Sequence, residues 1–308
     1  MNIREISFLT YILKCKTFST PLSDYCIKNT VNGNGMSLLA AYADDENSSI
    51  LGFCVLNKMN FKNISLDYLL VREENRRTGI GKKLLAAAIN YAKEQGNVAV
   101  LARIIINTKE DDLSFIIGNK LLTNYGFQIT RTSSIIRCNL EKSKPIWYNF
   151  MKEKGEKLIA RSKAKGFSVV SFAKAGGLID NLKKKIKDEF PRELNPTNFI
   201  DNPVDKLIPE LSFIAVKNNI PVSYCIATTV DGKALVFQQL SVALKYKRTG
   251  VFFLPFAAFM EQLFLQNSYH KVSYTVLDTN KEMIKLVNGF LDSFIESKKS
   301  QNFYMLLI

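Results

Sequence analysis

The sequence of 308 residues is 47% hydrophobic and 23% charged, a composition typical of a globular protein, and it is long enough for two domains of about 150 residues each. No apolar run approaches the roughly 20 residues that cross a bilayer, and the first residues lack the apolar core of a signal peptide, so we expect a cytoplasmic protein without a membrane span. The net charge of +14 is compatible with binding to nucleic acid, to an anionic membrane surface or to a polyanionic cofactor.

The N-terminal pattern predicts a strand, two helical pieces and a hairpin. The strand is expected from Asn2 to Phe8, a helix from Leu9 to Phe18, and a short helical piece from Pro21 to Asn29. Two largely apolar runs, Ser37 to Ala43 and Ile50 to Met59, flank a polar turn and predict a β-hairpin. The chain therefore opens with elements that lead into a sheet.

The next stretch combines a strand, a basic turn and a helix. Residues Ile64 to Val71 are almost all apolar, which predicts a strand buried on both faces, and Asp67 is its one charge. After the turn, Gly79-Ile80-Gly81 opens a helix whose apolar face comprises Ile80, Leu84, Ala88 and Ala92. The arrangement suits phosphate, because the amides of a first helical turn are unpaired, the helix dipole is positive there, and glycine admits the close approach of an anion.

Two familiar phosphate motifs do not fit this stretch. A P-loop needs a Gly five residues before Gly-Lys-Ser/Thr, and the dinucleotide fingerprint needs a Gly where this chain has Leu84. The spacing Val71-x-x-x-x-Arg76-x-x-Gly79-x-Gly81, followed by an apolar helix, instead resembles the signature of the GNAT superfamily of acetyl-CoA-dependent N-acyltransferases. A basic strand-to-helix turn in another α/β protein is the alternative interpretation.

The resemblance implies acetyl-CoA as the acyl donor. The end of the strand would pair its backbone with the pantetheine arm, and the loop amides would hold the pyrophosphate. The residues that the resemblance assigns to cofactor binding are Leu69, Leu70, Val71, Arg76, Arg77, Thr78, Gly79, Ile80, Gly81 and Lys82. In the family, a backbone amide near the splayed core strands binds the thioester oxygen, so Leu69 or Val71 is the candidate donor.

The first half ends with two further strands and a helix. Strands are expected at Asn97 to Ile106 and at Gln128 to Asn139, and a helix at Leu113 to Asn124. Gly126-Phe127 stands where GNAT proteins have a Gly-Phe pair at the end of this helix. The resemblance therefore covers the chain from residue 1 to about residue 142.

Beyond this point the order of elements begins again. Pro145 is expected to break regular structure, and Trp147 to Lys165 predicts a charged helix that bridges two units. The strands expected in the second half are Phe167 to Ala173, Leu211 to Lys217, Ile220 to Val230, Ala234 to Val242 and Lys271 to Leu277, with a turn at Asn218-Asn219. The helices expected there are Gly177 to Phe190, Val251 to Leu265 and Asn280 to Phe290.

The second half also repeats the loop in an altered form. Residues 247–252 (KRTGVF) align with residues 76–81 (RRTGIG), and three of the six are identical. Phe252 replaces the second glycine, and its bulk would fill the space of a pyrophosphate. We therefore expect an α/β (α+β) fold of two tandem GNAT-like domains, each a mixed central sheet flanked by helices, with chance similarity as the alternative. The expected bounds are 1–142 for a catalytic domain, 143–165 for a linker helix and 166–308 for a degenerate domain.

Asp67 is the candidate general base. It lies four residues before Val71, where many GNAT proteins carry an acidic residue that accepts the amine proton. A carboxylate in an apolar strand is also energetically costly unless it is paired or solvated, which points to a functional role. The alternative is an Asp at a strand end with a basic partner. The usual general acid of the family, a Tyr four residues before the Gly of Gly-Phe, is replaced by Leu122. Tyr68 is expected on the opposite strand face from Asp67, so no catalytic tyrosine is assigned.

The expected function is transfer of an acetyl group from acetyl-CoA to a primary amine of a small molecule or peptide. The alternative is a non-catalytic CoA-binding or interaction protein, in which Leu122 marks lost catalysis. No metal site is expected, because the five cysteines lack zinc spacing and His270 is the single histidine. A nucleic-acid partner rests on net charge alone, since the lysines at 183–185 fit a solvated helical face.

Overall fold

The computed structural model describes residues 1–20, 36–43, 49–59, 62–106, 113–191, 195–201, 206–230, 232 and 234–308. The short helical piece expected at Pro21 to Asn29 lies outside the described residues. In the described part of the chain, no helix is long and apolar enough to cross a membrane.

The chain folds into two compact units. Unit 1 comprises residues 1–133 and 299–308, and unit 2 comprises residues 134–298. This division differs from the expected bounds 1–142, 143–165 and 166–308 in two respects. Residues 299–308 belong to unit 1, because they pair with one of its strands, and the expected linker helix is part of unit 2.

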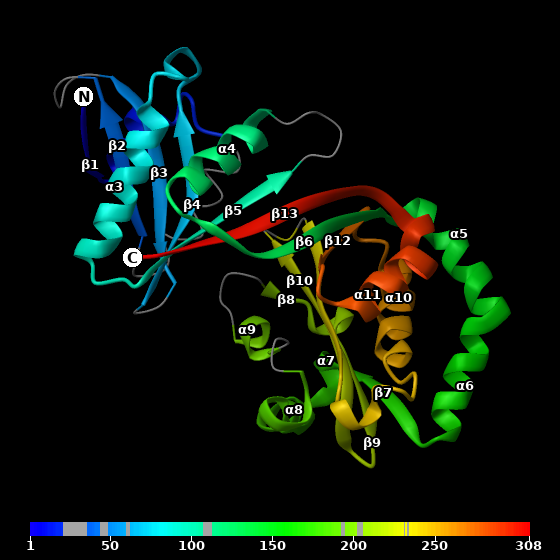
Figure 1. The fold of residues 1–308 in the computed structure, drawn as a ribbon. Helices are drawn as coiled ribbons and strands as arrows, with labels where there is room; N and C mark the ends of the chain where they lie inside the picture. Colours follow the sequence, from blue (N-terminus) through cyan, green and yellow to red (C-terminus); the bar gives the residue numbers. More distant parts are fainter. Residues whose placement is uncertain are drawn as a thin grey trace. The chain divides into compact units, whose positions relative to one another are not determined.

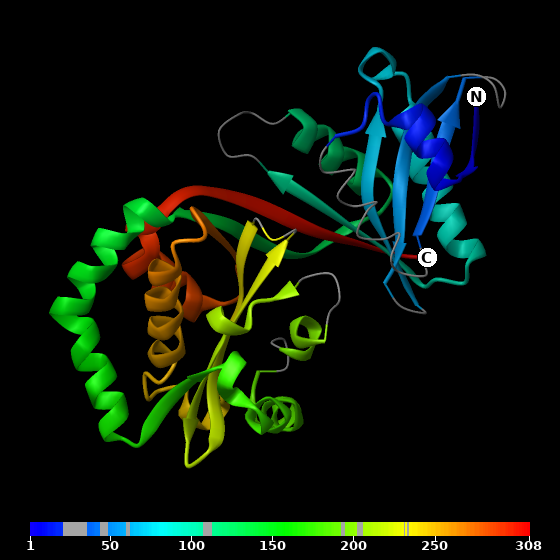
Figure 2. The same cartoon turned by 180° about the vertical axis from the view of Figure 1, so that it is seen from behind.

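Unit 1 is a mixed sheet with helices on both faces. Its elements are β1 (Asn2–Ile6), α1 (Phe8–Thr10) with a π-helical turn (Tyr11–Cys15), β2 (Met36–Tyr42), β3 (Ile50–Lys58), β4 (Asn63–Val71), α3 (Ile80–Glu94), β5 (Ala99–Ile106), α4 (Leu113–Asn124) and the first part of β6 (Gln128–Asn139). The strand order is β1-β2-β3-β4-β5-β13-β6, and the β4–β5 pair is parallel. Figure 1 shows α3 in front of this sheet, and Figure 2 shows the blue helix of residues 8–15 in front of its other face.

Two apolar layers hold unit 1 together. On one face, Leu84, Leu85, Ala88 and Ala92 of α3 are fully buried against Leu66 and its neighbours, as the predicted apolar stripe requires. On the other face, Tyr11 and Cys15 pack on Phe53 and Val55 of β3. The two faces of β4 are thus distinguished by their contacts, because Leu69 packs with the α3 layer and Tyr68 with the α1 layer.

Unit 2 repeats the same kind of mixed sheet. Its helices are α5 (Leu140–Phe150), a π-helical turn (Met151–Gly155), α6 (Glu156–Ala164), α7 (Phe172–Ala175), α8 (Gly177–Glu189), α9 (Thr197–Ile200), α10 (Phe253–Gln266) and α11 (Lys281–Leu286) with a π-helical turn (Val287–Leu291). Its strands are β7 (Phe167–Ser171), β8 (Lys206–Leu207), β9 (Phe213–Lys217), β10 (Ile220–Val230), β11 (Ala234–Val242), β12 (Lys271–Leu277) and the first part of β13 (Ile295–Leu307). The order β12-β11-β10-β9-β7, with β11 and β12 parallel, confirms the expected α/β (α+β) class in this unit as well.

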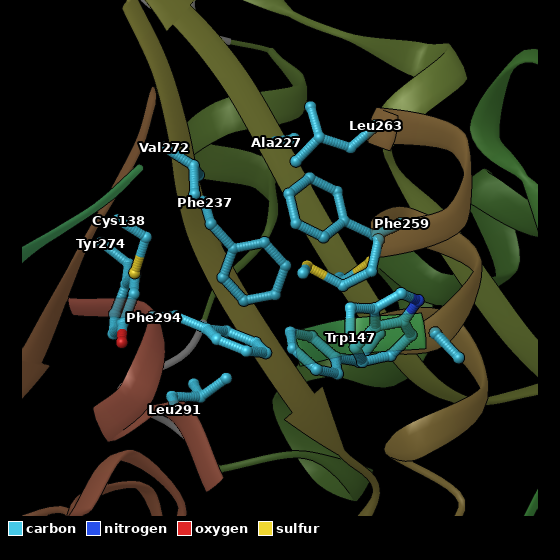
Figure 3. Close-up of a cluster of buried hydrophobic side chains, with 14 of the residues drawn as sticks. Cys138, Trp147, Ala227, Phe237, Phe259, Leu263, Val272, Tyr274, Leu291 and Phe294 are labelled. Carbon is cyan, nitrogen blue, oxygen red and sulfur yellow. The ribbon is translucent and has the colours of Figure 1, made fainter. Parts of the chain in front are cut away.

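The core of unit 2 is rich in aromatic residues. Phe237 of β11 lies with its ring centroid 4.8 Å from that of Phe259 of α10 (Figure 3), and Trp147 of α5 is fully buried beside them. The expected break at Pro145 is wrong, because Pro145 lies inside α5. The helix begins before the proline, where the Asn139 side chain accepts a hydrogen bond from the Lys142 amide (3.1 Å), and burial of Trp147 offsets the backbone hydrogen bond that proline removes.

The two units are related by an internal repeat that includes an irregularity of the sheet. Between β3 and β4 the pairing shifts from Val55–Tyr68 to Leu56–Leu66, which leaves Asp67 as an extra residue in a β-bulge. Between β10 and β11 it shifts from Ile226–Gln239 to Ala227–Phe237, which leaves Gln238. Each residue of these unit 2 pairs lies further along the chain than its unit 1 counterpart by one constant number of positions. By the same offset, Gln238 is equivalent to Asp67.

Among the elements of the described residues, strand β13 is a long one for which the sequence analysis makes no prediction. It extends from unit 2 into unit 1, where residues Ser300 to Leu307 pair antiparallel with Ile106 to Ala99 of β5. The sheet order places it between β5 and β6. Tyr304 is 1% exposed and packs in the α3 layer, so the sheet and core of unit 1 both contain residues from the far end of the chain.

Candidate active site

The end of β4 separates from its parallel neighbour. β4 pairs with β5 from Asn63–Ala99 to Leu66–Ala102, and within residues 62–106 no further pair follows although β4 continues to Val71 and β5 to Ile106. The divergence begins at the bulge residue Asp67, as expected from the stronger local twist of a bulged strand. The backbone groups of β4 that face β5 beyond Leu66 are therefore available to an extended ligand.

Asp67 lies beside this opening and is held by two neutral donors. The Ser65 hydroxyl donates to Asp67 Oδ1 at 2.5 Å, and Asn57 Nδ2 donates to Asp67 Oδ2 at 3.3 Å. Among the described residues no lysine or arginine forms an ion pair with this carboxylate, so the structure does not favour the alternative of an Asp with a basic partner. The carboxylate is half-buried and retains lone pairs for a further proton donor.

The expectation that Tyr68 faces away from Asp67 is wrong. Asp67 bonds to Asn57 and Ser65, whose strand positions place them on the α1 face, and Tyr68 packs in the α1 layer. The bulge explains this, because two successive residues of a bulged strand oppose one residue of the partner and lose strict alternation. The Tyr68 hydroxyl shares a 2.7 Å hydrogen bond with the Thr20 hydroxyl.

The loop before α3 has the geometry of an anion site. Gly79 precedes the helix with φ of 88°, a left-handed conformation that favours glycine, and the first helical hydrogen bond runs from Lys83 N to Gly79 O at 3.1 Å. The amides of Ile80, Gly81 and Lys82 therefore have no acceptor inside the helix. The exposed side chains of Arg76, Arg77 and Lys82 add positive charge, and Arg76 Nε also donates to the Val71 carbonyl at 3.3 Å.

Gly81 brings this loop against the end of β4. A Cβ atom at Gly81 would lie 3.8 Å from Leu69 Cδ2 and 3.8 Å from Val71 Cγ2, which are ordinary contacts. Alanine would thus fit, and it would favour the helix by up to about 1 kcal/mol. The protein itself does not require glycine here, so the absent side chain leaves room for something else. Leu70 packs in the α1 layer, and only its backbone can face the opening.

Comparison with known proteins gives a family for the segment that contains β4 and the loop before α3. Residues 3–112 match the model of the acetyltransferase (GNAT) family. This segment is a GNAT domain. The match contains β1 to β5, the bulge at Asp67 and the loop before α3. No curated protein matches the sequence significantly.

Solved structures extend the GNAT likeness to the whole chain. A tandem GNAT protein from the clavulanic acid biosynthesis pathway aligns with a TM-score of 0.68 at 13% identity, over 99% of this chain and 98% of that one. A GCN5-related N-acetyltransferase from Sphaerobacter thermophilus aligns with a TM-score of 0.64 at 12% identity, over 99% and 95%. These likenesses confirm the tandem GNAT fold predicted from the two loops and the repeated order of elements.

The GNAT domain has no tyrosine at the usual position of the general acid. Leu122 is 5% exposed and belongs to the apolar layer under α3 and α4. The Tyr125 hydroxyl donates to the Lys82 carbonyl at 3.0 Å, and the buried Tyr304 hydroxyl donates to Asn119 Oδ1 at 2.8 Å, so both hydroxyls are already engaged. Among the described residues, no group of three His, Cys, Asp or Glu side chains could hold a metal ion.

The second unit preserves the shape of the loop but not its free amides. Thr249 Oγ1 donates to Tyr246 O at 2.7 Å, as Thr78 Oγ1 does to Asn75 O at 2.6 Å, and Gly250 has φ of 76°. The helix start differs, because Val251 N donates to Thr249 Oγ1 at 3.4 Å and Phe253 N donates to Gly250 O at 3.1 Å. These bonds use the counterparts of the free Ile80 and Lys82 amides, and Phe252 replaces Gly81.

We therefore expect one acetyl-CoA molecule per chain. Calorimetric titration with acetyl-CoA should saturate at one equivalent, because only the GNAT domain of unit 1 combines free helix amides with a glycine at the approach point. A Phe252→Gly variant should also saturate at one equivalent, since the amides at the start of α10 remain bonded. Two equivalent sites in the unmodified protein would contradict this prediction.

Proposed function

We propose that the protein transfers an acetyl group from acetyl-CoA to a primary amine of a small molecule or peptide. The observation that carries the proposal is that three features meet on β4 and the adjoining loop. These are the strand end at Leu69 to Val71, which pairs with β3 but not with β5, the amides of Ile80 to Lys82, and the half-buried Asp67. Together they provide a place for pantetheine, for pyrophosphate and for a proton.

The proposed reaction is direct attack of the amine on the thioester. The new C–N bond forms as the C–S bond breaks, Asp67 accepts the proton that leaves the amine, and the CoA thiolate takes a proton from solvent. A backbone amide of Leu69 or Val71 would stabilise the oxyanion. Leu122 supplies no acid, so we assign most of the rate enhancement to positioning and to the oxyanion.

A covalent acetyl-cysteine intermediate is not part of this proposal. Cys54 pairs with Leu69 across the ladder and is the cysteine nearest the opening along these strands. It is fully buried, and desolvation raises the pKa of its thiol to about 12. A thiol with that pKa is almost entirely protonated at neutral pH and is a poor nucleophile.

The proposal predicts a selective effect of Asp67→Asn. With acetyl-CoA and a primary amine, turnover should fall about 100- to 10,000-fold, the usual contribution of a general base, while affinity for acetyl-CoA stays within about twofold. The fold should tolerate the change, because the Asn57 amide can turn to present its oxygen to the new side chain. Release of CoA and calorimetry measure the two effects separately.

The matched control is Gln238→Asn, which shortens the equivalent bulge residue of unit 2 and should leave turnover unchanged. Equal turnover of the Asp67→Asn variant and the unmodified protein would show that Asp67 is not the base. If the protein binds acetyl-CoA but acetylates no amine, the result would support the alternative function, a non-catalytic CoA-binding or interaction protein. The replacement of the family tyrosine by Leu122 is the observation that favours this alternative.

A further inference from the structure

A row of side chains crosses the sheet of unit 1 on the α1 face. Ala102 and Ile104 of β5 contact the α3 layer, so Arg103 between them lies on the opposite face. Phe303 of β13 is the direct pairing partner of Arg103 and therefore lies on the same face. The Arg131 guanidinium of β6 lies over the Phe303 ring, 4.1 Å from its centroid. The row is thus Arg103, Phe303 and Arg131.

This row begins at the opening where Asp67 lies. β5 is the neighbour of β4 in the sheet, and Arg103 is the first residue of β5 beyond its last pair with β4. Asp67 and Arg103 are on the same face, on opposite sides of the opening. Asp67 and Arg103 directly follow Leu66 and Ala102, the last residues that pair, so they lie where the strands, about 4.8 Å apart when paired, have only begun to diverge. An amine placed at Asp67 would therefore hold its next substituents within reach of the Arg103 side chain.

The two guanidinium groups have no anionic partner in the described residues. Arg103 and Arg131 are both exposed, and neither forms an ion pair with any carboxylate in those parts of the chain. A guanidinium presents a planar fork of N–H groups that matches a carboxylate or a phosphate. Asp67 can accept a proton from an amine, and the arginines of the row can donate hydrogen bonds to an anion, so the site is complementary to a molecule that carries both groups.

Unit 2 provides an internal comparison for this row. Its ladder pair Val236–Ser273 corresponds to Ser65–Leu101 of unit 1, so Thr275 stands where Arg103 stands. Gln238 replaces Asp67, and Phe252 replaces Gly81. The carboxylate, the guanidinium and the glycine are therefore present together in one unit and absent together from the other, as expected if all three serve one reaction.

We propose that the acceptor is a small primary amine that also carries an anionic group, a carboxylate or a phosphate, bound by Arg103 and, at greater reach, by Arg131 beside Phe303. This inference rests on the proposed function and specifies its acceptor. The amine points to Asp67 at the opening, and the anion lies over β5 toward β13. The strongly positive net charge of +14 would also attract such an acceptor.

The test compares acceptors that differ only in the anionic group. Acetyl-CoA-dependent release of CoA is measured with β-alanine against β-alaninamide, and with phosphoethanolamine against ethanolamine, which separates the carboxylate from the phosphate. At least one anionic member should exceed its neutral analogue in kcat/KM by about 10- to 100-fold, the usual worth of a charge-assisted contact. Arg103→Gln should remove most of that advantage, Arg131→Gln part of it, and Arg103→Lys should retain part.

Two controls keep the possible outcomes distinct. Arg161→Gln removes the same charge from an exposed position of α6 and should leave the preference unchanged. Calorimetry with acetyl-CoA should give the same affinity for Arg103→Gln as for the unmodified protein. Equal or better acetylation of the neutral amines, or an unchanged preference in Arg103→Gln, would overturn this inference and leave the proposed function standing. Failure to acetylate either of the two anionic amines would overturn this inference as well, and loss of acetyl-CoA binding by the unmodified protein would overturn the proposed function.

Discussion

Replacing Gly81 by phenylalanine is expected to weaken acetyl-CoA binding by at least about 100-fold while unit 1 stays folded. A phosphate at the start of α3 would accept hydrogen bonds from consecutive amides, each worth about 1.5–3 kcal/mol when the acceptor is charged. A bulky side chain at position 81 separates the phosphate from those amides. Phe252 shows that the same loop shape tolerates phenylalanine at the equivalent position in unit 2.

Gly81→Ala is the matched control for this prediction. Its Cβ atom makes only ordinary contacts with Leu69 and Val71, so thermal stability should be unchanged or slightly raised, and affinity should lie between those of the unmodified protein and Gly81→Phe. Calorimetry measures affinity, and thermal unfolding measures the fold. Unchanged affinity in Gly81→Phe, with the fold intact, would show that the cofactor does not bind at this loop.

Removing residues 299–308 is expected to unfold unit 1. The deletion takes away the antiparallel pairing of Ser300 to Leu307 with β5 and leaves a cavity where Tyr304 was buried. Loss of a buried aromatic side chain alone costs about 3–5 kcal/mol, and whole domains have only about 5–15 kcal/mol of stability. The truncated chain should lose acetyl-CoA binding and expose the amides of β5 to hydrogen exchange.

Leu307→Ala is the control for the truncation, because Leu307 is 72% exposed and contributes little to the core. In the Leu307→Ala variant, the amides of β5 should remain as protected from hydrogen exchange as those of the unmodified chain. A truncated protein that retains protection in β5 and binds acetyl-CoA normally would show that β13 is dispensable for unit 1, contrary to the pairing described above.

Much of the fold follows from local patterns in the sequence. Segments rich in apolar, β-branched and aromatic residues predict β11 and β12 with the bounds that the structure has, and the order of elements predicts the tandem arrangement. The Asn218-Asn219 turn is another example, since both residues have positive φ, as a tight hairpin between β9 and β10 requires. These features depend on neighbours in sequence, which is why a single sequence reveals them.

The features that the sequence did not reveal depend on distant segments. Pairing of β13 with β5 joins residues 299–308 to a segment in the first half of the chain, and no local period in a strand that begins with polar residues indicates such a partner. The bulge at Asp67 likewise depends on how β3 pairs with β4. A usable signal did exist for one residue of the proposed acceptor site, because Arg103, like Asp67, is a lone charge in an otherwise apolar strand.

The position of β13 has a consequence for the order in which the protein can mature. The GNAT segment emerges from the ribosome first. The sheet of unit 1 nevertheless lacks β13, the strand between β5 and β6, until Leu307 has emerged. The edge of β5 that pairs with β13 therefore stays unpaired while unit 2 is synthesised. An unpaired strand edge can form hydrogen bonds with strands of other molecules. The domain with the proposed catalytic residue Asp67 is translated first and completed last, so a chain interrupted anywhere in unit 2 would be released with the sheet of unit 1 unfinished.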